Sequence, residues 1–98
     1  MTSLRRKKVL VLDPRDNVAV AISDIRAGEE VEVDLGGRIL RIVAKSDIRF
    51  GHKIALKPIK RGEPVIKYGE VIGVATEDIE PGDHVHVHNV ASLRARRV

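Results

Sequence analysis

The sequence contains no cysteine, and only Phe50 and Tyr68 are aromatic among its 98 residues. The absence of thiols excludes disulfide bonds, thiolate nucleophiles and thiolate metal ligands, and it is compatible with a reducing, cytoplasmic location. Because aromatic rings are scarce, Val, Ile, Leu and Ala must build the core, and the β-branched members of this set favour strands. A chain of this length is sufficient for one domain and its single modest core.

Long hydrophobic runs and common enzyme motifs are also absent. The basic cluster at residues 5–8 is followed by only four apolar residues, 9–12, before Asp13 and Pro14 interrupt them. This run is too short for a signal peptide or a membrane-spanning helix, so no membrane association is expected. The sequence has no Gly-x-Gly-x-x-Gly motif, and none of its four serines lies in a nucleophile elbow. We therefore do not expect an enzyme that acts alone.

The net charge of +4 is concentrated near the two ends of the chain. Seven of the 18 basic residues lie at positions 5–8, 94, 96 and 97, which leaves 11 basic residues against 14 acidic ones. No aromatic stacking residues or ordered basic face accompany these tails. They are therefore more typical of solvated or docking segments than of nucleic-acid-binding arms, although binding of nucleic acid through them is a third, weaker hypothesis.

One turn pattern, Ala-x-x-x-Ile-x-x-Gly-acid-x-Val, occurs three times, at residues 21–31, 55–65 and 75–85. In each copy we expect the Ile to enter the core, the Gly to adopt a positive φ, and the Val to begin a strand. The glycines of the three copies are 34 and 20 residues apart, and this unequal spacing argues against a solenoid. The pattern indicates a structural turn used at three places in a compact sheet rather than a ligand-binding loop.

Short segments of alternating polarity between these turns predict an all-β fold of short strands and hairpins. At most one helical turn is expected, around residues 46–50, because no stretch of 3.6-residue period is long enough for a helix. Gly36 and Gly37 predict a two-residue hairpin turn. The predicted strands cover residues 18–22, 30–35, 39–43, 69–75 and 85–88.

Three of the four histidines, His84, His86 and His88, alternate with Val85 and Val87. On an extended strand the three imidazoles would share one face and the valines the other, with neighbouring imidazoles about 6–7 Å apart. That spacing is wide for three ligands of one metal ion, although two of them can chelate. The row is equally compatible with a solvent-exposed strand face, metal ligands, proton carriers, or donors to an anionic substrate.

Other polar residues form a candidate substrate-binding set. Gly51 allows a ligand to approach the backbone beside His52, the first residue of the set. The ammonium groups of two lysines, the phenol of a tyrosine and the amide of an asparagine suit the binding of a carboxylate. Each taken alone is more typical of a solvated surface residue than of a binding site. The set consists of His52, Lys53, Lys67, Tyr68 and Asn89.

Several strings of residues resemble one known family. The runs Gly-His-Lys-Ile-Ala-Leu at 51–56, Gly-Glu-Pro-Val-Ile-Lys-Tyr-Gly at 62–69 and Gly-Asp-His-Val-His-Val-His-Asn at 82–89 closely resemble the N-terminal SAF domain of the altronate/galactarate dehydratase family. The resemblance extends over about residues 16–90. It implies a basic tail and first strand at 1–15, a SAF domain of β-clip fold at 16–90, and a basic tail at 91–98.

The resemblance also implies a function. The family dehydrates a sugar acid by eliminating water across the carbons next to the carboxylate, with iron(II) or another divalent ion, which the partner subunit can hold. Since a catalytic domain follows this module in larger members, the chain is expected to be the small subunit of a two-component hydro-lyase, inactive alone, whose partners are a large catalytic subunit and a sugar acid. A homo-oligomer is a further option.

The resemblance assigns roles to the residues singled out above. His84, His86 and His88 would be catalytic, with His86 and His88 as metal ligands, and the candidate substrate-binding set would contact the substrate or the large subunit. Two alternatives stay open. One is the small subunit of a sulfolactate sulfo-lyase, which eliminates sulfite instead of water, and the other is a non-catalytic module for carbohydrate binding or assembly.

Overall fold

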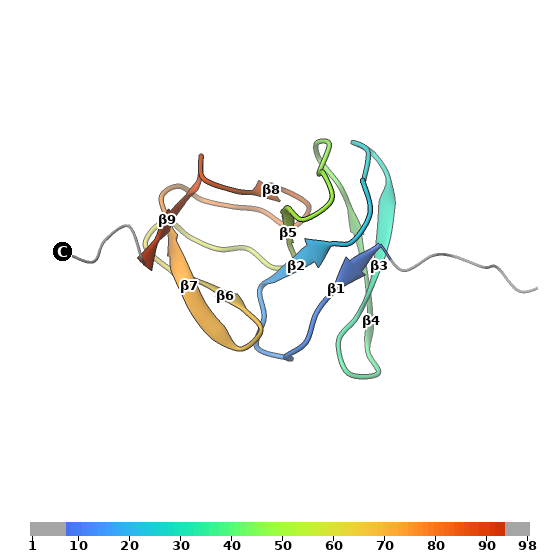
Figure 1. Ribbon diagram of the computed structural model, residues 1–98, viewed down its shortest axis with the longest axis horizontal. Helices are drawn as coiled ribbons and strands as arrows, with labels where there is room; N and C mark the ends of the chain where they lie inside the picture. Colours follow the sequence, from blue (N-terminus) through green and yellow to red (C-terminus); the bar gives the residue numbers. More distant parts are fainter. Residues whose placement is uncertain (1–7, 94–98) are drawn as a thin grey trace, which may run out of the picture.

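The computed structural model describes residues 8–93, so residues 1–7 of the predicted N-terminal segment 1–15 and residues 94–98 of the predicted tail 91–98 lie outside the described part (Figure 1). Within it every element is a strand, as the sequence predicts, and no helix is long and apolar enough to cross a membrane. The strands are β1 (Val9–Leu10), β2 (Val18–Ala21), β3 (Glu30–Asp34), β4 (Ile39–Val43), β5 (Lys53–Ala55), β6 (Pro64–Lys67), β7 (Glu70–Ala75), β8 (His84–Val85) and β9 (Val90–Ser92).

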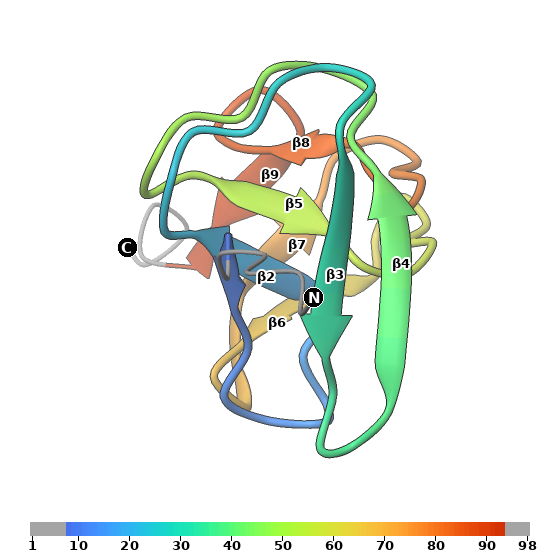
Figure 2. The same cartoon turned by 90° about the vertical axis from the view of Figure 1, so that its right-hand side faces the viewer.

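The strands form three small antiparallel sheets. The central sheet has the order β1-β2-β5-β8, and it lies between the β3–β4 hairpin and the sheet of order β6-β7-β9 (Figures 1 and 2). The tight turn of the β3–β4 hairpin contains Gly36 and Gly37 at φ 71° and 95°, which confirms the predicted hairpin. Strand β9 pairs with β7 as far as Ser92, which lies beyond residue 90, the end of the SAF domain expected from the sequence.

The core consists of two clusters on opposite faces of the central sheet. Because side chains alternate along a strand, Ala19 and Ile54 enter one cluster with the β3–β4 hairpin. Their neighbours Val18 and Ala55 enter the other cluster with Val65 of β6. Both clusters are aliphatic, as the scarcity of aromatic residues requires. Strands β2 and β5 are therefore the shared wall of two small cores.

The predicted turn occurs four times rather than three. The fourth copy covers residues 44–54, where Ala44, Ile48 and Gly51 occupy the pattern positions and Gly51 has φ 87°. The prediction of a helical turn around residues 46–50 is wrong. This segment pairs with the first copy of the turn through an isolated bridge between Ile25 and Ile48. The second and third copies pair in the same way through Ile59 and Ile79.

The acidic position of the pattern has a structural role in the three original copies. The carboxylates of Glu29, Glu63 and Asp83 each accept a hydrogen bond from the backbone N–H three residues earlier, at 3.0, 2.9 and 2.7 Å. In all four copies the backbone N–H at this position also donates to the carbonyl three residues earlier. In the fourth copy the residue is His52, and this bond to the carbonyl of Arg49 measures 2.9 Å. The turn is thus preserved while its side chain is replaced by an imidazole.

Four of the five predicted strands are confirmed, as β2, β3, β4 and β7. The fifth, predicted at 85–88, is wrong beyond Val85, because β8 ends there and the chain turns back at residues 86–89. As a result Val85 is buried whereas Val87 is 82% exposed, so the two valines do not share a face.

Candidate functional site: a histidine cluster

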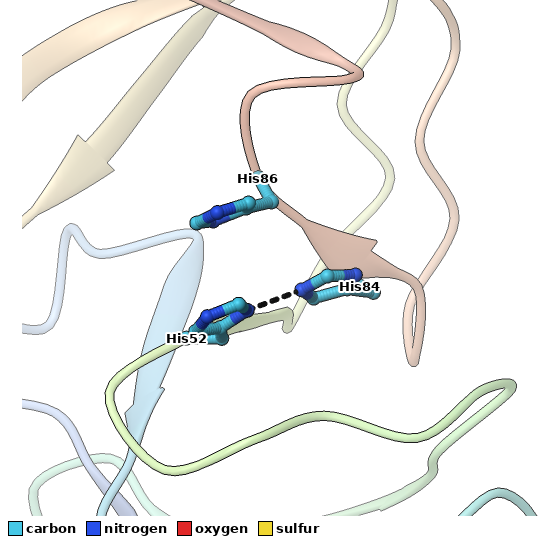
Figure 3. Close-up of side chains that lie close together, drawn as sticks. All are labelled: His52, His84 and His86. Carbon is cyan, nitrogen blue, oxygen red and sulfur yellow. Dashed lines mark hydrogen bonds between the residues drawn. The ribbon is translucent and has the colours of Figure 1, made fainter.

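Three imidazoles meet where β5 and β8 pair. His52 immediately precedes β5 and His84 begins β8, and the pairing of Ile54 with His84 brings them together (Figure 3). Nδ1 of His52 lies 2.8 Å from Nε2 of His84. The ring of His52 also stacks on that of His86, with centroids 4.1 Å apart and planes 10° apart. The cluster therefore joins two segments that are 32 residues apart in sequence.

The turn after β8 is held by Asn89. Its side-chain oxygen accepts a hydrogen bond from the backbone N–H of His86 at 2.9 Å, and its side-chain nitrogen donates to the carbonyl of His84 at 2.9 Å. Its backbone N–H donates to the carbonyl of His86 at 3.1 Å. Asn89 is only 4% exposed. The amide expected to read a substrate is instead engaged in orienting two of the three clustered histidines.

His88 lies at the margin of this cluster. Its ring centroid is 5.3 Å from that of His84, and the planes are tilted by 37°. The candidate ligand atoms that lie within 4.8 Å of one another belong to His52, His84 and His86. The predicted row on one extended strand is thus replaced by a compact trio, and the predicted ligand His86 is grouped with His52 and His84 rather than with His88.

The surroundings of the cluster favour neutral imidazoles. Burial lowers the pKa of His84, and the neighbouring charge of His52 lowers it further. The pKa of His86 is lowered for the same two reasons, in the same order. Lys53 also has a lowered pKa, because it is half-buried and faces Lys67. At neutral pH the ring nitrogens of His84 and His86 therefore carry lone pairs that are available to a ligand.

The trio has the composition of a metal-binding site. Neutral imidazole nitrogens are common ligands of first-row divalent ions, and three of them leave a coordination position open. Metal–nitrogen bonds of about 2.0–2.1 Å require the His52 and His84 nitrogens, now 2.8 Å apart, to separate by a few tenths of an ångström. The stacked His86 ring must rotate toward them. The donor set and the mutual distances of these residues therefore fit a divalent ion.

Two hollows flank the cluster. One has a volume of about 500 Å³ and is lined by His86 together with Lys53 and Lys67 of the predicted substrate-binding set. The other, of about 270 Å³, is lined by His84, His88 and Asn89 together with acidic residues. Tyr68 lines neither hollow; it lies at the β6–β7 turn with φ 56° and its ring 5.2 Å from Nζ of Lys67.

Comparison with known proteins identifies the family. Residues 7–93 match the family described as the altronate/galactarate dehydratase SAF domain. The chain belongs to this SAF domain family. The SAF domain is 43% identical over 83 residues to an altronate dehydratase of Bacillus subtilis, covering 85% of this chain but 16% of that protein. It covers 14% of the altronate dehydratase of Escherichia coli, at 51% identity over 74 residues.

A second group of relatives is much shorter. The SAF domain is 38% identical over 88 residues to the (2R)-sulfolactate sulfo-lyase subunit alpha of Chromohalobacter salexigens, covering 87% of this chain and 94% of that subunit. With the corresponding subunit of Paracoccus pantotrophus it shares 54% identity over 54 residues, which is 55% of this chain and 81% of that subunit. Relatives of the SAF domain thus include both long dehydratases and short lyase subunits.

Sequence reasoning did not place His52 among the candidate metal ligands. The pairing of β5 with β8 that brings it to His84 is a long-range contact, which no local pattern specifies. One local indication was available, because the SAF domain repeats its turn a fourth time with His52 at the position of the capping carboxylate. The turn pattern was defined with an acidic residue after the glycine, so it did not detect the copy at residues 44–54.

Proposed function

We propose that this SAF domain is the small component of a two-component hydro-lyase, which removes water from a hydroxy acid and is inactive without a large catalytic chain. The observation that carries the proposal is the cluster of His52, His84 and His86 beside a hollow lined by two lysines. The relatives support it, because the chain matches about one seventh of the altronate dehydratases but nearly all of a named lyase subunit.

The chemistry of such an elimination explains why these residue types are needed. A base must remove the proton beside the carboxylate, and the departing hydroxyl must be stabilised. We infer that His52, His84 and His86 hold a divalent ion, iron(II) first, which when bound would polarise the leaving oxygen. His88 stands beside His84 but outside the trio, so it is free to carry a proton.

Elimination of sulfite from a sulfolactate is a second candidate reaction. It is favoured by the match to the sulfo-lyase alpha subunits, which the chain covers over 94% and 81% of their lengths. The two reactions differ in the leaving group but share an acidic proton beside a carboxylate. The same cluster therefore suits either reaction, and assays for both products distinguish them.

Reconstitution with the large catalytic chain tests the proposal. The chain that co-purifies with the native protein is expressed separately, and dehydration of altronate and galactarate and release of sulfite from sulfolactate are measured with iron(II). We expect activity only in the mixture, and a loss of about 10²–10⁴-fold in kcat for His86→Ala. Lys57→Ala, at an exposed position outside the site, is the matched control. Equal turnover by the large chain alone would contradict the proposal.

A further inference from the structure

The hollow beside the histidine cluster carries an excess of positive charge. Lys53 at the start of β5 and Lys67 at the end of β6 both line it. Among residues 8–93 neither lysine forms an ion pair, since the pairs in this range involve Lys8, Arg15 and Arg41. The Lys67 ammonium lies over the ring of Tyr68, 5.2 Å from its centroid. Two cations therefore line one hollow without an ion-pair partner among the described residues.

The net charge of the hollow limits what it can bind. Glu70 also lines it and stands opposite Lys67 in the β6–β7 register, although the two side chains form no ion pair. The two lysines and the one glutamate together contribute a charge of about +1 to this surface. Such a surface suits a singly charged oxyanion better than a doubly charged phosphate.

The walls of the hollow strengthen this attraction. Five of the ten residues that line it are apolar, and a lower local dielectric increases the energy between unlike charges. The volume of about 500 Å³ lies within the range of small-ligand sites. Lys53 is half-buried in a strand paired on both sides, so its backbone is fixed. The apolar lining consists of Val71, Ile72, Val87, Val90 and Leu93.

We propose that Lys53 and Lys67 bind the carboxylate of the hydroxy acid, so that its leaving group faces His86. This inference rests on the proposed function and adds to it an orientation, the acid group in the hollow and the leaving group at the histidines. It also makes the hollow a binding site that this chain provides by itself and that works without a metal ion, because neither His52 nor His84 lines it.

Binding to the isolated chain, freed of metal with a chelator, tests the inference. Backbone amide shifts are followed by NMR during titration with altronate, methanesulfonate and inorganic phosphate. We expect altronate and methanesulfonate to shift amides around residues 53, 67 and 87, and phosphate to bind at least threefold more weakly. The Kd for altronate should rise at least tenfold in Lys67→Met and in Lys53→Met. Lys60→Met, at an exposed position outside the hollow, should leave it unchanged.

Two comparisons separate this inference from the proposed function. His52→Ala should abolish lyase activity of the reconstituted enzyme yet keep altronate binding to the isolated chain. If Lys53→Met fails to fold, Lys67→Met decides, since Lys67 lies at the end of a peripheral strand. Unchanged binding in a folded Lys67→Met, or phosphate binding as tight as altronate binding, would overturn the inference, and neither result would affect the assignment of the lyase.

Discussion

His52 is the residue on which the candidate metal centre depends most directly, because it is the only member of the trio outside the segment 84–89. Without it, His84 and His86 offer two nitrogens from one turn. We therefore expect His52→Ala to weaken binding of cobalt(II) or zinc to the isolated chain by at least tenfold. Isothermal titration and the visible spectrum of cobalt(II) measure this loss.

The matched control for that measurement is His88→Ala. His88 is the nearest histidine outside the trio, so its removal should leave affinity within about twofold of the unsubstituted chain and the cobalt spectrum unchanged. If His88→Ala weakened binding more than His52→Ala did, the ligand set would be the pair His86 and His88 predicted from the sequence.

Asn89 determines whether the turn presents His84 and His86 correctly. Asn89→Ala removes both side-chain hydrogen bonds to the part-buried backbone groups of these histidines. We expect the free energy of unfolding to fall by about 1–3 kcal/mol, together with weaker metal binding. Asn89→Asp, which keeps an oxygen acceptor for the His86 N–H, should lose less. Urea unfolding of both variants provides the comparison, and an unaffected Asn89→Ala would contradict this role.

The lowered pKa values of His84 and His86 predict a pH dependence of stability. Their ordinary value is 6.5, so below it the unfolded chain binds protons that the folded chain does not. Without metal, the free energy of unfolding should therefore decrease as the pH falls from 7 to about 5.5. Urea midpoints across this range test the sign. The double variant His84→Gln, His86→Gln should show a smaller slope, and an equal slope would exclude the two histidines as its cause.

At the scale of elements, the third copy of the turn, which includes His84, packs against the β3–β4 hairpin. Gly82 at φ 93° lies so close to the hairpin that an added Cβ would overlap the carbonyl oxygen of Val43. Gly28 has a similar φ of 87° but open space around it. Gly28→Ala should cost about 1–2 kcal/mol from backbone strain alone. Gly82→Ala should cost clearly more, and comparable urea midpoints for the two variants would refute the close approach.

The proline positions show how far local sequence specifies these elements. Asp78 accepts a hydrogen bond from the N–H of Arg61 in the facing turn at 2.9 Å. In the opposite direction, the side chain at position 58 would accept a hydrogen bond from the backbone N–H at position 81. Both positions are proline, so Pro58 has no acceptor side chain and Pro81 has no N–H donor. The sequence could identify these turns and most strands from alternation, glycine and proline.

The rest of the site was beyond such reasoning. The alternation of histidine and valine after residue 84 is identical to that of a strand, and the turn forms because the Asn89 side chain bonds back to His84 and His86. Lys53 and Lys67 were identified individually, but their shared hollow depends on the packing of β5 near the end of β6. Contacts between distant segments are set by the whole fold, not by local pattern.

At the scale of the whole molecule, the two cores share β2 and β5, so we expect them to unfold together. Ile48 and Ile79 are each 1% exposed and occupy equivalent turn positions in different cores. Substitution of either by Ala should cost about 2–5 kcal/mol. Far-UV circular dichroism and NMR should report one coincident transition for each variant. Two separated transitions would show that the cores are independent.

The fourth turn has a consequence for how such a domain acquires reactivity. In the other three turns the side chain at the position of His52 is a carboxylate that accepts a hydrogen bond from the backbone of its own turn. The backbone hydrogen bond at this position is the same in all four turns. The turn thus accommodates a chemically useful side chain at this one position with no change in loop length. The same scaffold offers three further sites, at residues 29, 63 and 83, for grafting a reactive side chain, at the expense of one intrinsic stabilising bond each.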